Sequence, residues 1–279
     1  MRLQDTARLW AAGGRPAVVV EVVDTQGSAP REAGARMLVA ADEVAGTIGG
    51  GHLELQAIEL ARARLAAGHR QVFDQRYPLG PALGQCCGGV VTLRFASLDE
   101  RDVTTWPEEP VLFTLQLYGA GHVGRAIARL LATLPCRVQW IDERAGEFPD
   151  GLAEGRPEAR TLWPAHIEPV CVDTVEAEVD EAPPGAYYLV LTHRHDLDLR
   201  ICEAILRRRD FAYLGLIGSK TKRARFEHQL LGRGIAPEAL ARMTCPIGVP
   251  GIEGKAPEVI AVAVAAQLLQ HANAARRQP

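Results

Sequence analysis

Two adjacent cysteines form the most reactive group in the sequence. The segment GQCCGGVV, residues 84–91, places Cys86 and Cys87 directly before two glycines. A thiolate is the softest metal ligand among the side chains, and glycines let the backbone approach a bound group closely. A disulfide between sequence neighbours would strain the backbone, because ordinary bridges join Cα atoms that lie farther apart. The segment therefore predicts an exposed thiol beside a second one, at a point where the chain meets a bound group.

The best-defined motif is LYGAGHVGRAIA, in which Gly119, Gly121 and Gly124 complete the pattern GxGxxG. It lies between a predicted strand and a predicted helix, and Asp142 ends the next predicted strand. In a Rossmann-type unit such glycines let the backbone touch a phosphate, and the acid accepts hydrogen bonds from ribose hydroxyls. The helix N-terminus favours the negative charge of the phosphate. The motif predicts a phosphate-binding turn; a Rossmann unit whose phosphate site is empty or repurposed is the alternative.

A second glycine-rich turn, GTIGGGHLE, covers residues 46–54. Gly49, Gly50 and Gly51 would expose N–H donors at the start of a helix, which suits an anion. The turn lacks the Lys-Ser/Thr pair of a P-loop, so nucleotide hydrolysis is not indicated. Two interpretations stay open, a tight structural turn and an anion-binding cradle.

Two further segments carry groups that can bind ligands. THRHD, residues 192–196, places His193 and His195 just after a predicted strand, where ligands bind in parallel sheets. A metal site there would need a third ligand from elsewhere in the chain. LIGSKTKR, residues 216–223, offers a glycine, a serine and a lysine at another predicted helix start. Its basic run is more typical of a solvated face than of an anion site.

The remaining cysteines, Cys136, Cys171, Cys202 and Cys245, form no CxxC pair. The first three lie in apolar patterns that are typical of the core, because a free cysteine packs as a small hydrophobic residue. No ordered set of serine, histidine and aspartate stands out, and no pair of carboxylates does. Hydrolase chemistry therefore has no positive support.

Short β-branched runs separated by glycine turns predict the strands of an N-terminal α+β domain, residues 1–96. The runs are PAVVVEVVD, ARMLVA and VVTLRF. Residues 52–68 predict a helix between them. The residues expected on or near its buried face are Leu55, Ile58, Ala61 and Leu65. The polar, proline-bearing segment 97–110 predicts a linker to a second domain.

From residue 111 onward, strands and helices alternate. Alternation at this spacing predicts a Rossmann-like parallel-sheet domain, residues 111–279, with helices on both faces. The closing helix, PEVIAVAVAAQLLQ, is apolar nearly all round. Such a helix must be covered on several sides, so we expect it to contact the other domain or a second subunit in a homodimer. The predicted fold class is therefore α/β, with an N-terminal α+β domain followed by a C-terminal Rossmann-like domain.

The composition excludes several classes of protein. The chain has 279 residues, a hydrophobic fraction of 47%, a charged fraction of 23% and a net charge of −3. These values are ordinary for a globular protein, and nothing in the charge favours nucleic acid as a partner. The first residues lack the apolar stretch of a secretion signal, and the longest apolar run is too short to span a bilayer. We therefore expect a cytoplasmic protein with reduced thiols.

Seven segments in order give the chain a family resemblance over roughly residues 17–270. It resembles the xanthine dehydrogenase accessory factor family, XdhC/CoxI. The segments are DTQGSAPREAGARMLV, GTIGGGHLE, CCGGVVTL, YGAGHVGRAIA, THRHDLDLRICEAIL, GLIGSKTKRARF and CPIGVPGIEGKAPEVIAVAVAAQLL. One glycine motif would be unspecific, whereas seven ordered segments are not.

The resemblance implies a function. Members of this family are understood to bind molybdenum cofactor (molybdopterin), to support its sulfuration, and to insert it into a xanthine dehydrogenase. The sulfur donor is a partner cysteine desulfurase. The family's cysteine aligns with Cys87, and this sequence adds Cys86 before it. The resemblance thus implies that Cys87 meets the molybdenum; whether it ligates the metal, carries sulfur or lines the pocket stays open.

Three classes of function compete. A non-catalytic cofactor chaperone makes use of the thiols and of the glycine turns. An NAD-dependent oxidoreductase would use the GxGxxG motif with Asp142, but it leaves the thiols unexplained and has no clear acid or base. A scaffold would only dock the desulfurase against the dehydrogenase. The sequence favours the chaperone, with Cys86, Cys87, the glycines of both turns and Asp142 as its binding residues.

Overall fold

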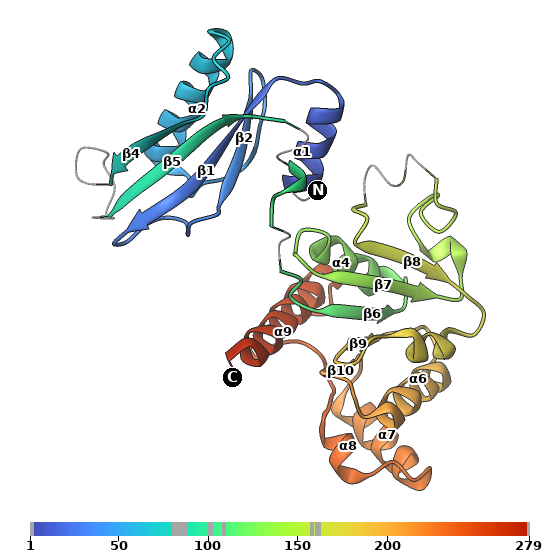
Figure 1. The fold of residues 1–279 in the computed structure, drawn as a ribbon. Coiled ribbons are helices and arrows are strands. Elements are labelled where there is room, and N and C mark those ends of the chain that lie inside the picture. Colours follow the sequence, from blue (N-terminus) through green and yellow to red (C-terminus); the bar gives the residue numbers. More distant parts are fainter. Residues whose placement is uncertain are drawn as a thin grey trace. The chain divides into compact units, whose positions relative to one another are not determined.

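The computed structural model describes residues 3–79, 89–99, 103–107, 110–156, 159 and 163–277. The chain forms two compact units, Met1–Glu108 and Glu109–Pro279 (Figure 1). Among the described residues, no helix is both long and apolar enough to cross a membrane.

The first unit contains an antiparallel sheet whose two faces are covered by α2 and α1. Its strand order is β3-β2-β1-β5-β4. Helix α2 covers the face that carries alternate residues of β1, among them Val18, Val20 and Val22. Helix α1 covers Ala17 and Val19 on the opposite face. The elements are α1 (Leu3–Ala12), β1 (Ala17–Gln26), β2 (Arg36–Ala40), β3 (Val44–Gly46), α2 (Gly51–Ala66), β4 (Phe73–Pro78) and β5 (Val90–Ser97).

Helix α2 packs through a stripe that overlaps the predicted one. Ala61 is fully buried as predicted, and Ile58 and Leu65 pack against the same core cluster. Leu55 is wrong, because it is 52% exposed. The fully buried positions recur every fourth residue and so share one side of the helix; they are Leu53, Ala57 and Ala61. Two alanines in this stripe allow the helix to lie close to the sheet.

Part of the segment predicted as a linker belongs to the first unit. Ser97 ends β5, and Val103 is fully buried in the cluster that also holds Trp10 of α1. Trp106 packs against the same cluster. These apolar side chains anchor a polar-looking stretch to the first unit, because burying them removes apolar surface from water.

The second unit is a parallel sheet in the order β11-β10-β9-β6-β7-β8, and each pairing in it is parallel. This confirms the predicted fold class. The chain runs outward from β6 to β8 and then returns to the other side of β6 with β9. Ligands in open α/β sheets bind beyond the carboxyl ends of the strands at such a reversal. The strands are β6 (Thr114–Tyr118), β7 (Arg137–Asp142), β8 (Ile167–Cys171), β9 (Tyr187–Val190), β10 (Tyr213–Leu216) and β11 (Met243–Thr244).

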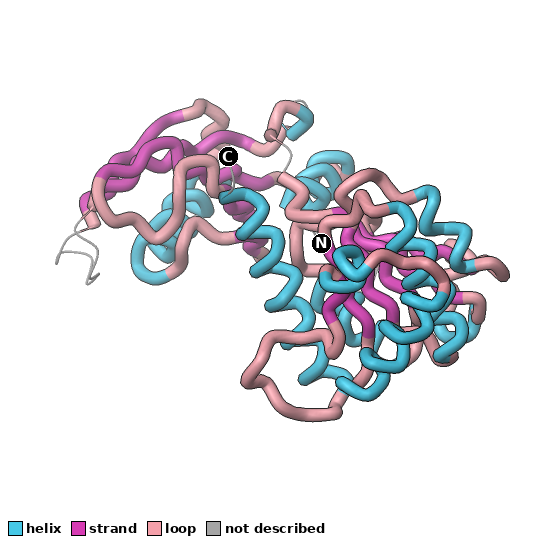
Figure 2. The backbone as a smooth tube through the Cα atoms, turned by 90° about the horizontal axis from the view of Figure 1, so that it is seen from below, coloured by secondary structure: helices cyan, strands magenta, loops and turns pink. Residues whose placement is uncertain are grey.

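Helices lie on both sides of this sheet (Figure 2). One core cluster joins the sheet to α4 and α9 through residues such as Ile127 and Val264. The other joins it to α6 and α7 through residues such as Ile201 and Phe226. The helices are α4 (His122–Leu131), η2 (Ala145–Glu147), η3 (Val175–Glu181), α6 (His195–Arg208), α7 (Lys220–Gly232), α8 (Pro237–Ala241) and α9 (Pro257–Arg277).

Helix α9 is covered partly within its own unit. It packs along α4, and Ala261, Val264 and Leu268 are fully buried there. Val262 is 51% exposed. The apolar character of this helix is therefore used in part by the unit's own core, and the homodimer stays a prediction.

Candidate functional site

The glycine turn after β6 contains two glycines that the backbone requires. Gly119 has φ +120°, and a Cβ there would overlap the carbonyl oxygen of Leu191. A Cβ on Gly124 would overlap the carbonyl oxygen of Gly119. These two positions bring helix, turn and neighbouring strand close together, a packing role that a larger residue cannot fill.

Gly121 differs from the other two glycines of the motif. It caps the N-terminus of α4 with φ −65°, and no side chain caps that end of the helix. A Cβ on Gly121 would meet no atom within 4 Å. The space in front of this turn is therefore open, and the packing of the unit does not require glycine here.

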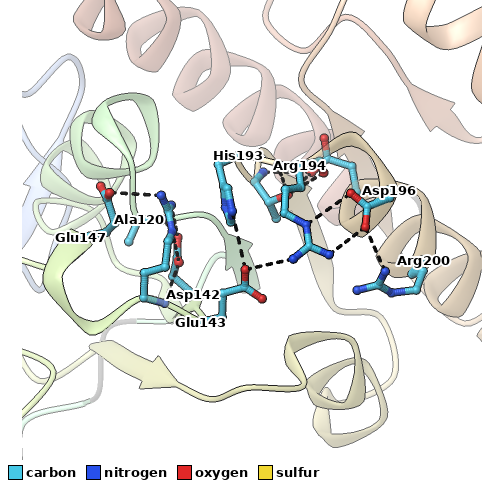
Figure 3. Close-up of polar contacts among 11 residues, drawn as sticks. Ala120, Asp142, Glu143, Glu147, His193, Arg194, Asp196 and Arg200 are labelled. Carbon is cyan, nitrogen blue, oxygen red and sulfur yellow. Dashed lines mark hydrogen bonds and ion pairs between the residues drawn. The ribbon is translucent and has the colours of Figure 1, made fainter.

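The Asp142 carboxylate is buried behind this turn and fully hydrogen-bonded (Figure 3). Its Oδ2 accepts from the Ala120 N–H at 2.7 Å and from Arg144 Nη2 at 3.0 Å. Its Oδ1 accepts from the Arg144 N–H at 3.0 Å and from Arg144 Nε at 2.9 Å. A carboxylate offers about four lone-pair positions, so the predicted bonds to ribose hydroxyls would have to displace one of these donors.

The same contacts decide the acidity of Asp142. Burial by itself would raise the pKa of this carboxyl, but the hydrogen bonds from Arg144 and Ala120 outweigh burial and lower the pKa below its ordinary value. Asp142 is therefore charged in the folded protein, and its charge is neutralised by Arg144 next to it.

A row of charged side chains crosses the carboxyl edge of the sheet from the residue after β7 to the start of α6 (Figure 3). Glu143 Oε1 lies 3.6 Å from His193 Nε2 and 3.6 Å from Arg194 Nη1. Asp196 continues the row with ion pairs to Arg194 at 2.7 Å and to Arg200 at 3.1 Å. These bridges link the connections after β7 and β9, on either side of the glycine turn.

The two histidines of the THRHD segment have separate partners. His193 faces Glu143, whereas His195 Nδ1 lies 2.9 Å from Arg225 Nη2 of helix α7. Within the described part of the chain, no group of three or more His, Cys, Asp and Glu side chains is placed to hold a metal ion. The structure therefore does not bring these histidines together as metal ligands.

A buried ion pair ties the connections after β9 and β10. Lys222 Nζ donates to Asp198 Oδ2 at 2.6 Å and to the Ile217 carbonyl oxygen at 2.9 Å. The other oxygen, Asp198 Oδ1, accepts from the N–H of Thr192 at 2.9 Å and from its hydroxyl at 2.7 Å. Sequence reasoning missed this pair, and the only signal was the presence of acids in the first turn of α6 and of lysines in the first turn of α7.

The helix start at residues 218–220 is closed locally. The Ser219 hydroxyl accepts from the Lys222 N–H at 3.2 Å and so caps α7. A Cβ on Gly218 would collide with the Lys222 side chain. Lys220 is exposed, which is consistent with a solvated basic face.

The N-terminal glycine turn is occupied by the chain's own carboxylate. Glu54 Oε2 accepts from the Thr47 hydroxyl and from the N–H groups of Ile48 at 3.0 Å and Gly50 at 3.1 Å. The Gly49 N–H donates to Thr47 Oγ1 at 3.1 Å. Between the two interpretations left open by the sequence, these contacts favour a tight structural turn, because the N–H groups of Gly49 and Gly50, two of the three that an external anion would use, are already bonded.

The same end of the first unit brings three segments together. A Cβ on Gly49 would collide with Pro30, and one on Gly89 would overlap the carbonyl oxygen of Ser28. At the base of the β4–β5 hairpin, the Leu79 N–H donates to the Gly89 carbonyl oxygen at 2.7 Å. The predicted thiols, Cys86 and Cys87, lie outside the described residues. Of the two described residues that flank this segment, Gly89 lies against the loop at residues 27–30, and Leu79 is hydrogen-bonded to Gly89.

The described cysteines are mostly core residues. Cys136, Cys202 and Cys245 are buried, whereas Cys171 is exposed at the end of β8 and departs from the core prediction. Cys171 is the last residue of an edge strand in which Ile167, at the other end, is the buried residue. Burial raises the pKa of the Cys136 thiol to about 12, which makes it unreactive.

Family models match both parts of the chain. The XdhC and CoxI family model matches residues 10–77, and the XdhC Rossmann domain model matches residues 115–268. A curated relative is the uncharacterized protein YqeB of Escherichia coli strain K12, which is 32% identical over 264 residues. That match covers 92% of this chain but 44% of YqeB, so the chain spans less than half of that relative's length.

A solved structure shares the fold. A crystal structure of a xanthine dehydrogenase from Bacillus halodurans superposes with a TM-score of 0.72 and covers 100% of this chain and 97% of that one. The two sequences are 18% identical. At this level of identity the similarity concerns the fold.

Proposed function

The chain belongs to the XdhC and CoxI family, and from that premise we propose that it acts in the maturation of a xanthine dehydrogenase. In this role it binds molybdenum cofactor, supports its sulfuration and delivers it to the enzyme. The molybdenum cofactor is cargo rather than a resident group. The observation that carries the proposal is that family models match both units, over residues 10–77 and 115–268, and that these ranges include both glycine turns.

The first unit would present the thiol. The segment with Cys86 and Cys87 begins and ends at a hairpin base that Gly89 anchors under the loop at residues 27–30. Cys87 is the residue of this segment that aligns with the family's cysteine. When bound, the cofactor would supply the molybdenum centre that takes up a sulfido ligand. A thiolate is a suitable partner for the metal and for the sulfur.

The residues of the N-terminal glycine turn would act as support. Gly49, Gly50 and Gly51 were predicted to bind the cofactor, but Glu54 takes the Ile48 and Gly50 N–H groups. We propose that this turn holds the loop at residues 27–30 in place through the Gly49 contact with Pro30. The role of the turn toward the cargo is then indirect.

The second unit fits a phosphate. Gly121 opens α4 with nothing within 4 Å of its Cβ position, and no side chain caps that end of the helix. A helix N-terminus with open space in front favours a negatively charged group. Gly119 and Gly124 would keep the turn close to the sheet, while Gly121 would let the phosphate-bearing end of the cargo approach the backbone.

The partners follow from the same role. We propose that a xanthine dehydrogenase receives the cofactor, that a cysteine desulfurase supplies sulfur, and that the protein works in the cytoplasm as a homodimer. The two partners come from the family, the homodimer from the apolar closing helix, and the location from the apolar pattern of the sequence.

The proposal is tested by anaerobic binding and transfer. The full chain is mixed with molybdenum cofactor, separated from free cofactor, and assayed for bound molybdenum and for activation of cofactor-free xanthine dehydrogenase. We expect about one molybdenum per chain and recovery of dehydrogenase activity. Turnover of an alcohol or hydroxy acid with NAD, without cofactor retention, would instead establish the oxidoreductase.

The cysteine variants assign the thiol. Cys87→Ser should lose cofactor retention or sulfuration, because serine keeps the size but replaces a soft thiolate by a hard oxygen. Cys86→Ser is the matched control and should retain cofactor. If only Cys86→Ser loses cofactor retention, Cys86 rather than Cys87 has this role. If both variants keep full function, the thiols are structural.

A further inference from the structure

The environment of Asp142 also carries information about the ligand of the second unit. In Rossmann units that bind a dinucleotide with an unphosphorylated ribose, the acid at the end of the second strand accepts hydrogen bonds from the ribose hydroxyls. Here that acid already accepts four hydrogen bonds, one from Ala120 and three from Arg144. Its residual accessibility is 4%. A ribose diol therefore finds no free acceptor on Asp142.

Asp142 instead orients Arg144. The guanidinium binds through Nε and Nη2 to the two carboxylate oxygens at 2.9 and 3.0 Å, which is the bidentate geometry. Its Nη1 lies 3.1 Å from Glu147 Oε1. A guanidinium carries five N–H donors, and its contacts with the described residues use three of them. Two donors therefore remain without a described partner, on an arginine side chain that is 33% exposed.

A second arginine also contacts Glu147. Arg125 of α4 donates from Nη2 to the Glu147 main-chain oxygen at 2.6 Å, and its Nε is buried without a hydrogen-bond partner among the described residues. Glu147 is itself 36% exposed. Of the partners of Arg144, it is the one that an incoming anion could replace without uncovering Asp142.

We propose that Arg144, held by Asp142 beside the Gly119–Gly121 turn, selects a ligand that carries a phosphomonoester over one that presents a ribose diol. A phosphomonoester has between one and two negative charges and three acceptor oxygens, which match the free donors of a fixed guanidinium. The inference rests on the proposed role of this turn in binding phosphate. The phosphate could come from the cofactor or from a 2′-phosphorylated nucleotide, and the experiment separates the two.

The nucleotide measurement compares 2′-phospho-ADP-ribose with ADP-ribose by calorimetry on the full chain. We expect the phosphorylated probe to bind about tenfold more tightly or better, since charge-assisted hydrogen bonds to phosphate are the stronger ones. Arg144→Ala should remove the difference. Arg144→Lys should keep part of it, because lysine supplies a charge but not the fork. Arg129→Ala is the matched control, since Arg129 is an exposed arginine of α4.

The cofactor measurement uses the same variants. Loss of cofactor retention in Arg144→Ala but not in Arg129→Ala assigns the phosphate to the cofactor; a tenfold preference for 2′-phospho-ADP-ribose that depends on Arg144 assigns it to a nucleotide. Either result supports the proposal. The proposal is overturned by a folded Arg144→Ala protein that is unchanged in both measurements. It is also overturned if the wild-type chain binds ADP-ribose at least as tightly as the phosphorylated probe and its cofactor retention does not depend on Arg144. If the wild-type chain retains no cofactor and activates no dehydrogenase, the maturation role fails, while the nucleotide measurement still decides the role of Arg144.

Discussion

The two glycine turns of this protein look alike in sequence but are built differently. Each opens a helix, and in each a carboxylate accepts backbone N–H groups of the turn. In the first unit the carboxylate is Glu54, from the helix that the turn opens. In the second it is Asp142, from the neighbouring strand β7. A carboxylate from the helix itself occupies N–H donors of the turn. A carboxylate from the neighbouring strand leaves the space next to Gly121, at the start of the helix, open.

The glycines divide in the same way. Gly50 has φ +74°, so its conformation favours glycine although the space around it is empty. Gly121 has φ −65°, so glycine there is not required by the backbone. An open position without a backbone reason for glycine is the stronger sign of a ligand. On this criterion the second turn is the better candidate for binding phosphate.

The largest expected effect is on Gly124, where the comparison depends on close packing. Gly124→Ala would drive a Cβ into the Gly119 carbonyl oxygen, a rigid backbone atom. We expect a loss of roughly 3 kcal/mol or more in the free energy of unfolding. Urea unfolding of the full chain followed by circular dichroism measures it. Gly232→Ala in α7 is the control, because nothing lies within 4 Å of its Cβ position; equal stability of both variants would contradict the packing role.

Asp142→Asn tests the carboxylate behind the second turn. An asparagine can still accept hydrogen bonds, but its NH₂ group would face donors from Ala120 or Arg144, and Arg144 would lose its charge partner. We expect a loss of about 2 kcal/mol. Hydrogen exchange of the α4 amides would show whether the loss is local to the turn. Asp150→Asn, at an exposed carboxylate, should leave stability unchanged.

The acid side of the stability curve gives an independent test of Asp142. Its folded pKa is lowered, so it stabilises the fold above the pKa of an unfolded aspartate, about 4, and this contribution disappears as the pH falls through the folded value. We expect the wild-type free energy of unfolding to decline more steeply than that of Asp142→Asn below about pH 4. Parallel curves for the two proteins would show that Asp142 is not held in its charged form.

Glu54→Gln should lower the free energy of unfolding by less than Asp142→Asn does. Glu54 is only partly buried, has no arginine partner among the described contacts, and holds the turn through one oxygen. Glutamine keeps a neutral acceptor, so we expect a loss of about 1 kcal/mol. Glu59→Gln on the exposed side of the same helix is the reference. A cost above that of Asp142→Asn would reverse the proposed order of the two turns.

The smallest effect on stability is expected for Gly121→Ala. Its φ is ordinary and its surroundings are open, so the loss should stay within about 1 kcal/mol, the scale of an unfavourable N-cap residue. Its effect should appear in binding, because the new methyl group occupies the space in front of the turn. Thermal unfolding and retention of bound molybdenum, measured on the same sample, separate the two. If a stable Gly121→Ala variant retains as much molybdenum as the wild-type protein, this turn does not bind the phosphate.

Local patterns predicted most of the second unit. The run RVQWID coincides with β7, Arg137–Asp142, because a β-branched and aromatic strand between a turn and a polar segment has a clear local signature. β4 and β8 were not predicted. β4, with the sequence FDQRYP and largely exposed, carries little apolar alternation. β8 is an edge strand with the sequence IEPVC, and the proline within it weakens the pattern.

The candidate site was predicted less completely than the fold. Sequence spacing located the Gly119–Gly124 motif and Asp142, since both are defined by nearby residues. It could not show that the Asp142 carboxylate also accepts a hydrogen bond from the N–H of Ala120, which lies 22 residues away. Nor could it pair Lys222 with Asp198, which are separated by 24 residues. Side-chain pairs at such separations depend on how two loops meet at the sheet edge.

The sequence by itself therefore determined where strands alternate with helices, where the chain must turn on glycine, and to which family it belongs. These properties are local or cumulative, and a periodic pattern or an ordered set of motifs is enough to specify them. Only the tertiary structure decided which turn keeps its donors free. That depends on whether a carboxylate reaches the turn from its own helix, as Glu54 does, or from a strand behind it, as Asp142 does. Hydrogen bonds of this kind are fixed only when separate segments are packed, because each donor then has to find its partner within about 3 Å.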